Sequence, residues 1–160
     1  MVDGLIEQAA ACNVRLRAIL IVGPLGMLWA YRVATFVDEG NQLRINFVAV
    51  PHARITEKRT ASVSSEIALR LLDDIAKSPR VIPGKPNPPS DDPEDLGEFA
   101  FNLLLVKLDG AQPTYWHGHL YDIFPKNEDK EVLGYVNQLV DMTTTTYKHG
   151  DPVPAPQDAS

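Results

Sequence analysis

The spacing of apolar residues changes several times along the chain, and each change marks a predicted element. Residues 2–13 place apolar side chains at helical spacing, which predicts a short N-terminal helix. Residues 14–22, 27–37 and 43–50 instead show the alternation that is typical of strands. A Gly-Pro-Leu-Gly turn separates the first two, and a polar turn that contains Gly40 separates the next two. The first part of the chain therefore predicts a helix followed by an antiparallel meander.

Helical spacing returns at residues 64–77, where the predicted helix ends before Pro79. Residues 99–108 and 114–124 flank an Asp-Gly pair, which is a strong signal for a β-hairpin. A last helix is predicted from Asn127 onward. We therefore expect an α+β fold in the order α-βββ-α-ββ-α. Its five strands should form one mainly antiparallel sheet with the helices packed on one face.

Three polar or proline-rich segments lie between and after these elements. Residues 53–62 are polar, and we expect them to be irregular or to extend the third strand. Residues 79–97 combine six prolines with an acidic cluster, which predicts a long loop. Residues 149–160 hold three further prolines and predict a flexible tail. The remainder, residues 1–148, is expected to form a single domain.

The composition is that of an ordinary globular protein, because 44% of the residues are hydrophobic and 22% are charged. The formal net charge of −6 is unevenly divided, with +2 on residues 1–80 and −8 on residues 81–160. The single cysteine, Cys12, cannot form an intrachain disulfide, and the first residues lack the basic segment of a secretory signal. The Gly-Pro-Leu-Gly turn interrupts the apolar stretch at residues 18–31, which predicts two strands instead of a membrane helix. We expect a cytoplasmic protein that does not enter a membrane.

The strand predicted at residues 114–124 carries the most distinctive side chains. Alternation places Tyr115, His117, His119 and Tyr121 on one face, and exposed tyrosines there favour contact with another protein or peptide. A metal site is the alternative, because two histidines at this spacing on a strand can both bind zinc. His52 is the candidate for a third ligand. No established metal-binding motif accompanies these residues, so we predict no cofactor and keep zinc as the alternative.

Arginines are concentrated on or beside the first three predicted strands. Arg15, Arg17, Arg32 and Arg44 would make one part of the sheet basic, and they complete the predicted binding surface. Either a partner or the acidic segment at residues 91–98 could neutralise them. Nucleic acid is the less favoured partner, because the chain has no glycine-rich phosphate loop, RNA-binding aromatic motif or helix-turn-helix pattern.

No pattern in the chain supports an enzyme, since nucleophile-elbow and nucleotide-binding motifs are absent from the sequence. The leading hypothesis is a non-enzymatic, homodimeric module that binds another polypeptide through its sheet. The order of elements over residues 2–142 is similar to that of the small acidic chaperones of type III secretion. This resemblance implies a dimer that holds an extended segment of its partner. Two alternatives remain: a small metal-dependent hydrolase or metal-binding protein centred on His117 and His119, and an immunity or inhibitor protein.

Overall fold

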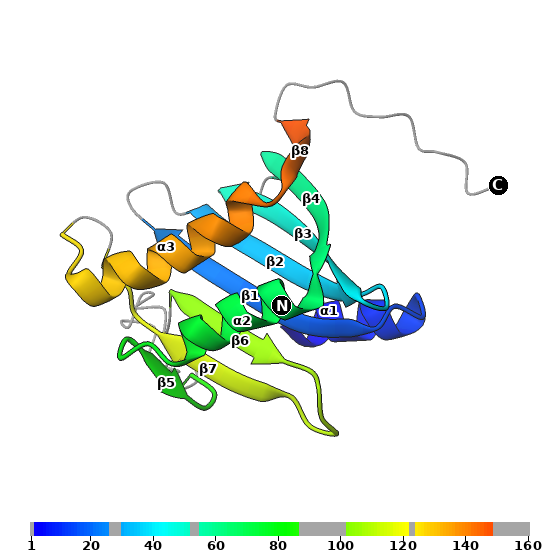
Figure 1. Ribbon diagram of the computed structural model, residues 1–160, viewed down its shortest axis with the longest axis horizontal. Coiled ribbons are helices and arrows are strands. Elements are labelled where there is room, and N and C mark those ends of the chain that lie inside the picture. Colours follow the sequence, from blue (N-terminus) through cyan, green and yellow to red (C-terminus); the bar gives the residue numbers. More distant parts are fainter. Residues whose placement is uncertain (1, 26–29, 52–54, 87–101, 122–123, 149–160) are drawn as a thin grey trace, which may run out of the picture.

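One antiparallel sheet organises the protein (Figure 1). The computed structural model describes residues 2–25, 30–51, 55–86, 102–121 and 124–148. The helices are α1 (Val2–Ala11), α2 (Ser65–Ala76) and α3 (Asn127–Asp141). The strands are β1 (Leu16–Leu25), β2 (Ala30–Asp38), β3 (Gln42–Pro51), β4 (Glu57–Ser64), β5 (Val81–Pro83), β6 (Leu103–Lys107), β7 (Thr114–Gly118) and β8 (Thr144–Lys148).

The described strands form an eight-stranded sheet in the order β5-β7-β6-β1-β2-β3-β4-β8, in which every neighbouring pair is antiparallel. The α+β class, the meander and the hairpin between β6 and β7 confirm the prediction, but the expected number of five strands is wrong. Strand β4 lies in the segment expected to be irregular or to extend the third strand. Strand β5 lies in the predicted loop, and β8 follows the last predicted helix.

The main core lies between the sheet and helices α2 and α3. Ala18, Leu20 and Val22 of β1 face this side and are buried with apolar residues of both helices. The stripes of the two helices contribute residues at helical spacing, namely Ala68, Leu71, Leu72 and Ile75 from α2 and Val132, Val136 and Leu139 from α3. This burial explains why the amphipathic spacing of both helices predicted them correctly.

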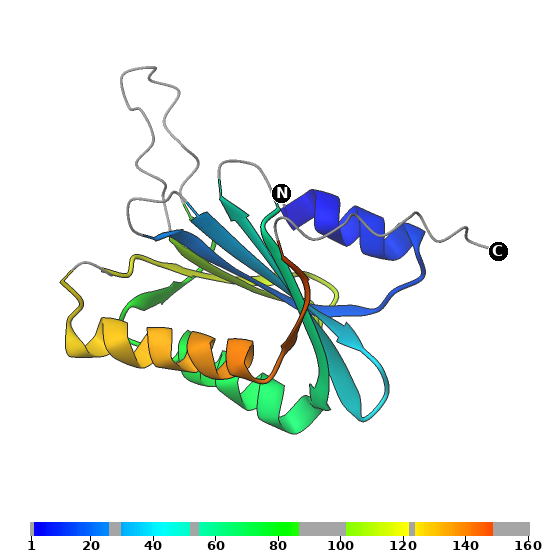
Figure 2. The same ribbon diagram turned by 90° about the horizontal axis from the view of Figure 1, so that it is seen from above.

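Helix α1 lies on the opposite face of the sheet (Figure 2), so the expectation that all helices share one face is wrong. Ile19 and Ile21 of β1 point to this side and form a second buried cluster with Leu104 and Val106 of β6. Val2, Leu5 and Ile6 of α1 pack against that cluster. Because β1 and β6 are apolar on both faces, each face needs a cover.

Strand β7 ends at Gly118, although the sequence predicted a strand as far as residue 124. The side chain of Asn102 takes over the pairing there. Its Oδ1 accepts a hydrogen bond from the Leu120 backbone N–H at 2.6 Å, and its Nδ2 donates to the Leu120 carbonyl at 2.5 Å. These bonds direct the chain away from the sheet and toward α3, with Leu120 buried in the main core.

Candidate binding surfaces

Tyr115 and His117 lie on β7 and pair with Val106 and Leu104 of β6, whereas His119 and Tyr121 follow the end of β7. Tyr115 packs against the α1-side cluster, and the ammonium of Lys85 lies 4.8 Å from its ring centre. His119 is exposed beyond the end of β7. The guanidinium carbon of Arg80 lies 5.6 Å from the ring centre of Tyr121. Whether these residues contact a partner stays a prediction.

His117 has a structural partner. Its Nδ1 lies 2.8 Å from the backbone carbonyl oxygen of Gly84, so the ring links β7 to the segment after β5. Within the described ranges, no group of three or more His, Cys, Asp and Glu side chains could hold a metal ion. His52, the expected third zinc ligand, lies outside the described residues.

Three of the four predicted arginines are neutralised by carboxylates in or next to the turns between strands. Arg15 Nη1 lies 3.3 Å from Asp38 Oδ2, and Arg17 Nε lies 2.6 Å from Asp109 Oδ1. Arg44 forms an ion pair with Glu39, with 3.2 Å between Nε and Oε1. The acidic segment at residues 91–98, expected as one source of neutralisation, lies outside the described residues.

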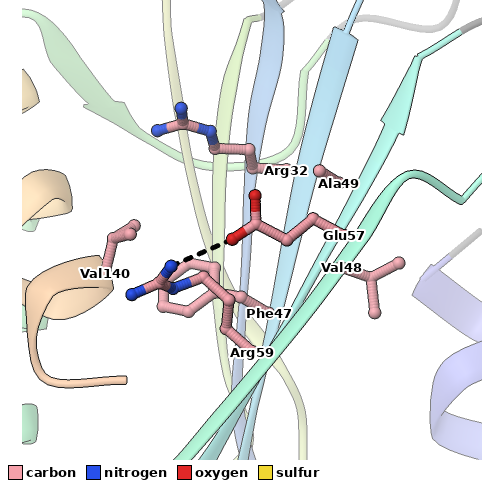
Figure 3. A pocket seen from close by; sticks show the side chains of 7 residues that line it. All are labelled: Arg32, Phe47, Val48, Ala49, Glu57, Arg59 and Val140. Carbon is pink, nitrogen blue, oxygen red and sulfur yellow. Dashed lines mark hydrogen bonds and ion pairs between the residues drawn. The ribbon is translucent and has the colours of Figure 1, made fainter. Parts of the chain in front are cut away.

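Arg32 differs from these three, because no residue in the described part of the chain forms an ion pair with it. It lies on β2 and lines a small pocket on the side of the sheet that α2 and α3 cover (Figure 3). The pocket has a volume of about 50 Å³. It is lined by Arg32, Phe47, Val48, Ala49, Glu57, Arg59 and Val140.

Arg59 lines this pocket and also links β4 to the chain that follows α3. Its Nε donates to Thr143 Oγ1 at 2.9 Å, and its Nη2 donates to the Thr143 carbonyl at 2.7 Å. Its Nη1 donates to Glu57 Oε1 and to Thr145 Oγ1, both at 2.9 Å. The guanidinium therefore links β4 to Thr143, between α3 and β8, and to Thr145 of β8. Arg59 and Glu57 were not predicted as site residues, although Ala61 and Val63 extend their alternation and could have revealed the strand.

Glu57 is held in its ionised form. The hydrogen bond from Arg59 lowers the pKa of its carboxyl group below the ordinary value of 4.5, and partial burial opposes this effect. The positive charges of Arg59 and Lys148 and a hydrogen bond from Thr145 also lower this pKa.

Replacing Glu57 by glutamine should lower the free energy of unfolding at neutral pH. A carboxyl whose pKa is lowered in the folded state stabilises the protein above its unfolded pKa. That contribution is lost as the pH falls through the pKa of the carboxyl group in the folded state. Because the side chain is one-third exposed, we expect a loss of at most about 1 kcal/mol. Urea unfolding measures this loss. The difference in free energy of unfolding between Glu57→Gln and the original protein should shrink below about pH 4.5. Glu7→Gln in α1 is the control, and an equal, pH-dependent loss there would contradict the assignment.

A second hollow lies on the other face of the sheet, between α1 and β2. It is an open groove of about 230 Å³. Its lining residues carry no charge, and they are Leu5, Gln8, Ala9, Cys12, Val14, Leu16, Thr35 and Val37. No residue of α1 is fully buried, so the helix covers the sheet only partly and leaves this apolar surface accessible.

The two edges of the described sheet are poor sites for adding a further strand. Strand β5 has only three residues, and Pro83 has no N–H to donate. The pairing of β8 with β4 is irregular between Lys58 and Arg59, and β8 ends in Lys148. Short, bulged and charged edges discourage strand pairing. The groove and the pocket on the faces are therefore the better candidates for binding.

Comparisons with protein-family models, with curated proteins and with solved structures found no match for this chain. Along the described segments, no helix is both long and apolar enough to span a membrane.

Proposed function

We propose that this protein is a non-enzymatic binding module that holds an extended segment of another polypeptide against its sheet. The observation that carries the proposal is the uncharged groove between α1 and β2. The groove is open and has a volume of about 230 Å³. A groove of this size suits one or two apolar side chains of a bound peptide.

The surroundings of the groove favour the same function. Val33 and Val48 are only half-buried on the sheet face next to α1, so a peptide lying there would cover further apolar surface. Apart from the thiol of Cys12, no titratable or metal-ligating side chain lines the groove. This lining supports binding without chemistry.

Selection of displayed peptides, followed by affinity measurement, tests this proposal. We expect the selected peptides to carry an apolar anchor residue, and Val14→Asp should weaken their binding about tenfold or more. Val14 is 38% exposed at the groove, so the substitution should leave folding intact. Ile67→Asp is the matched control, because Ile67 is 41% exposed on α2, away from the groove, and its effect should stay within about twofold.

Cys12 supplies a second measurement that needs no substitution. It is the only cysteine of the chain, and it is exposed at the groove. Bound peptide should slow its alkylation by iodoacetamide. The proposal fails if no apolar anchor is selected, if both aspartate variants weaken binding equally, or if alkylation keeps its rate at saturating peptide. The homodimer remains a separate prediction, which light scattering on the purified protein tests.

A further inference from the structure

The pocket around Arg32 and Arg59 lies on the opposite side of the sheet from the groove, so it is a separate site. Three neighbouring strands and the end of α3 contribute its walls (Figure 3). Arg32 comes from β2, Phe47 from β3, Arg59 from β4 and Val140 from α3. Two guanidinium groups thus meet an apolar wall in one small space.

The hydrogen bonds of Arg59 fix its position and leave it partly available. A guanidinium has five N–H groups. Arg59 uses one at Nε, two at Nη1 and one at Nη2, which leaves one N–H of Nη2. Since Arg59 is already held by Thr143, Thr145 and Glu57, a ligand would not have to order it. Arg32 has no hydrogen-bond partner among the described residues, so its guanidinium can donate two parallel bonds to one carboxylate.

The charges of the lining favour an anion. Arg32 and Arg59 are positive and Glu57 is the only negative residue of the lining, so the pocket carries a net charge of +1. The ion pair of 2.9 Å between Arg59 and Glu57 directs one carboxylate oxygen of Glu57 to Arg59 (Figure 3). One further carboxylate would neutralise the site.

The size of the pocket and its apolar wall restrict the class of ligand further. A volume of about 50 Å³ has room for about three or four water-sized groups, so the pocket can enclose the carboxylate of an acid but not the whole of its chain. Phe47 and Val140 offer the chain an apolar contact that inorganic anions cannot use. We propose that this pocket binds the carboxylate of a small organic acid between Arg32 and Arg59, with the acid's short apolar chain against Phe47 and Val140.

A nuclear magnetic resonance titration of isotope-labelled protein with butyrate tests this site. Butyrate should shift the Nε–H resonances of Arg32 and Arg59 to saturation, whereas sodium chloride at equal ionic strength should not. Acetate, with a shorter chain, and inorganic phosphate should both bind more weakly. Arg32→Gln should weaken butyrate binding about tenfold or more, and Arg32→Lys, which keeps the charge but not the two parallel donors, should show a smaller loss.

Arg70→Gln on the exposed side of α2 is the matched control and should leave butyrate binding unchanged. Val14→Asp in the groove should also leave it unchanged, so this inference and the proposed function can fail separately. The site is overturned if butyrate shifts the two arginines no more than chloride does, or if Arg32→Gln keeps full affinity. Equal affinity for phosphate and butyrate would overturn the organic acid as the ligand.

Discussion

Asp129→Ala should lower the free energy of unfolding by about 3 kcal/mol. The side chain of Asp129 is fully buried in the first turn of α3. Its Oδ2 accepts a hydrogen bond of 2.9 Å from the Lys126 backbone N–H, and its Oδ1 lies 3.0 Å from Arg80 Nε without the alignment of a hydrogen bond. Alanine removes the cap of α3, which accounts for about 1 kcal/mol. It also leaves the mostly buried Arg80 without its counter-charge, which accounts for about 2 kcal/mol more.

Urea or guanidinium unfolding near neutral pH measures this loss. Asp129→Asn keeps an acceptor for the Lys126 backbone N–H but removes the charge. We therefore expect it to lower the free energy of unfolding by less than Asp129→Ala does. Glu128→Ala is the matched control, because Glu128 lies in the same first turn but is exposed, and its loss should stay below about 1 kcal/mol. Similar losses for Asp129→Ala and Glu128→Ala would show that the buried ion pair contributes no more than the helix dipole.

The sequence predicted the elements whose apolar spacing is set by one buried face. The stripes of α2 and α3 and the alternation of β2 and β3 arise in this way. Strand β4 was missed because Glu57 and Arg59 occupy its inward positions, where the pocket and the α3–β8 junction need charged groups. Strand β8 was missed because Thr144, Thr145 and Thr146 are all exposed, so no alternation marks them. The position of α1 was predicted wrongly, although the uninterrupted apolar run of β1 indicates a strand covered on both faces.

The candidate site was harder to predict, because it depends on pairing between distant residues. The four arginines lie on or beside β1, β2 and β3, but the carboxylates that neutralise Arg15 and Arg17 become their neighbours only through the strand register. The alternation from Tyr115 to Tyr121 failed at Gly118, where the side chain of Asn102 replaces the ladder. The hydrogen bonds of Asn102 join residues that are 16 or more positions apart in the chain, so no local spacing of residues predicts them.

Gly118→Ala should lower the free energy of unfolding by about 2 kcal/mol or more, because overpacking of a tight site costs this much. Gly118 lies between β5 and β6 and pairs with both Val81 and Leu103. An added Cβ would meet the backbone carbonyl oxygen of Arg80 at an impossibly short distance, with the Arg80 carbonyl carbon at 3.2 Å and Val81 Cα at 3.4 Å. All three atoms belong to backbone, so no side-chain rotation can make room. The substitution therefore has to displace β5.

Gly134→Ala is the matched control, and we expect it to act in the opposite direction. Gly134 lies inside α3 with no atom within 4 Å of an added Cβ, so alanine should stabilise the helix by about 0.5–1 kcal/mol. Chemical unfolding of both variants should separate them by about 3 kcal/mol. A Gly118→Ala variant as stable as the original protein would mean that β5 is not held against β7.

The two large effects should also depend on each other. The carbonyl that blocks a Cβ at Gly118 belongs to Arg80, the residue whose side chain pairs with Asp129. Displacing β5 therefore loosens the same ion pair that Asp129→Ala removes. For this reason the double variant should lose less stability than the two single losses combined, by about 1 kcal/mol. Strict additivity would instead show that the backbone of Arg80 can move while its guanidinium stays on α3.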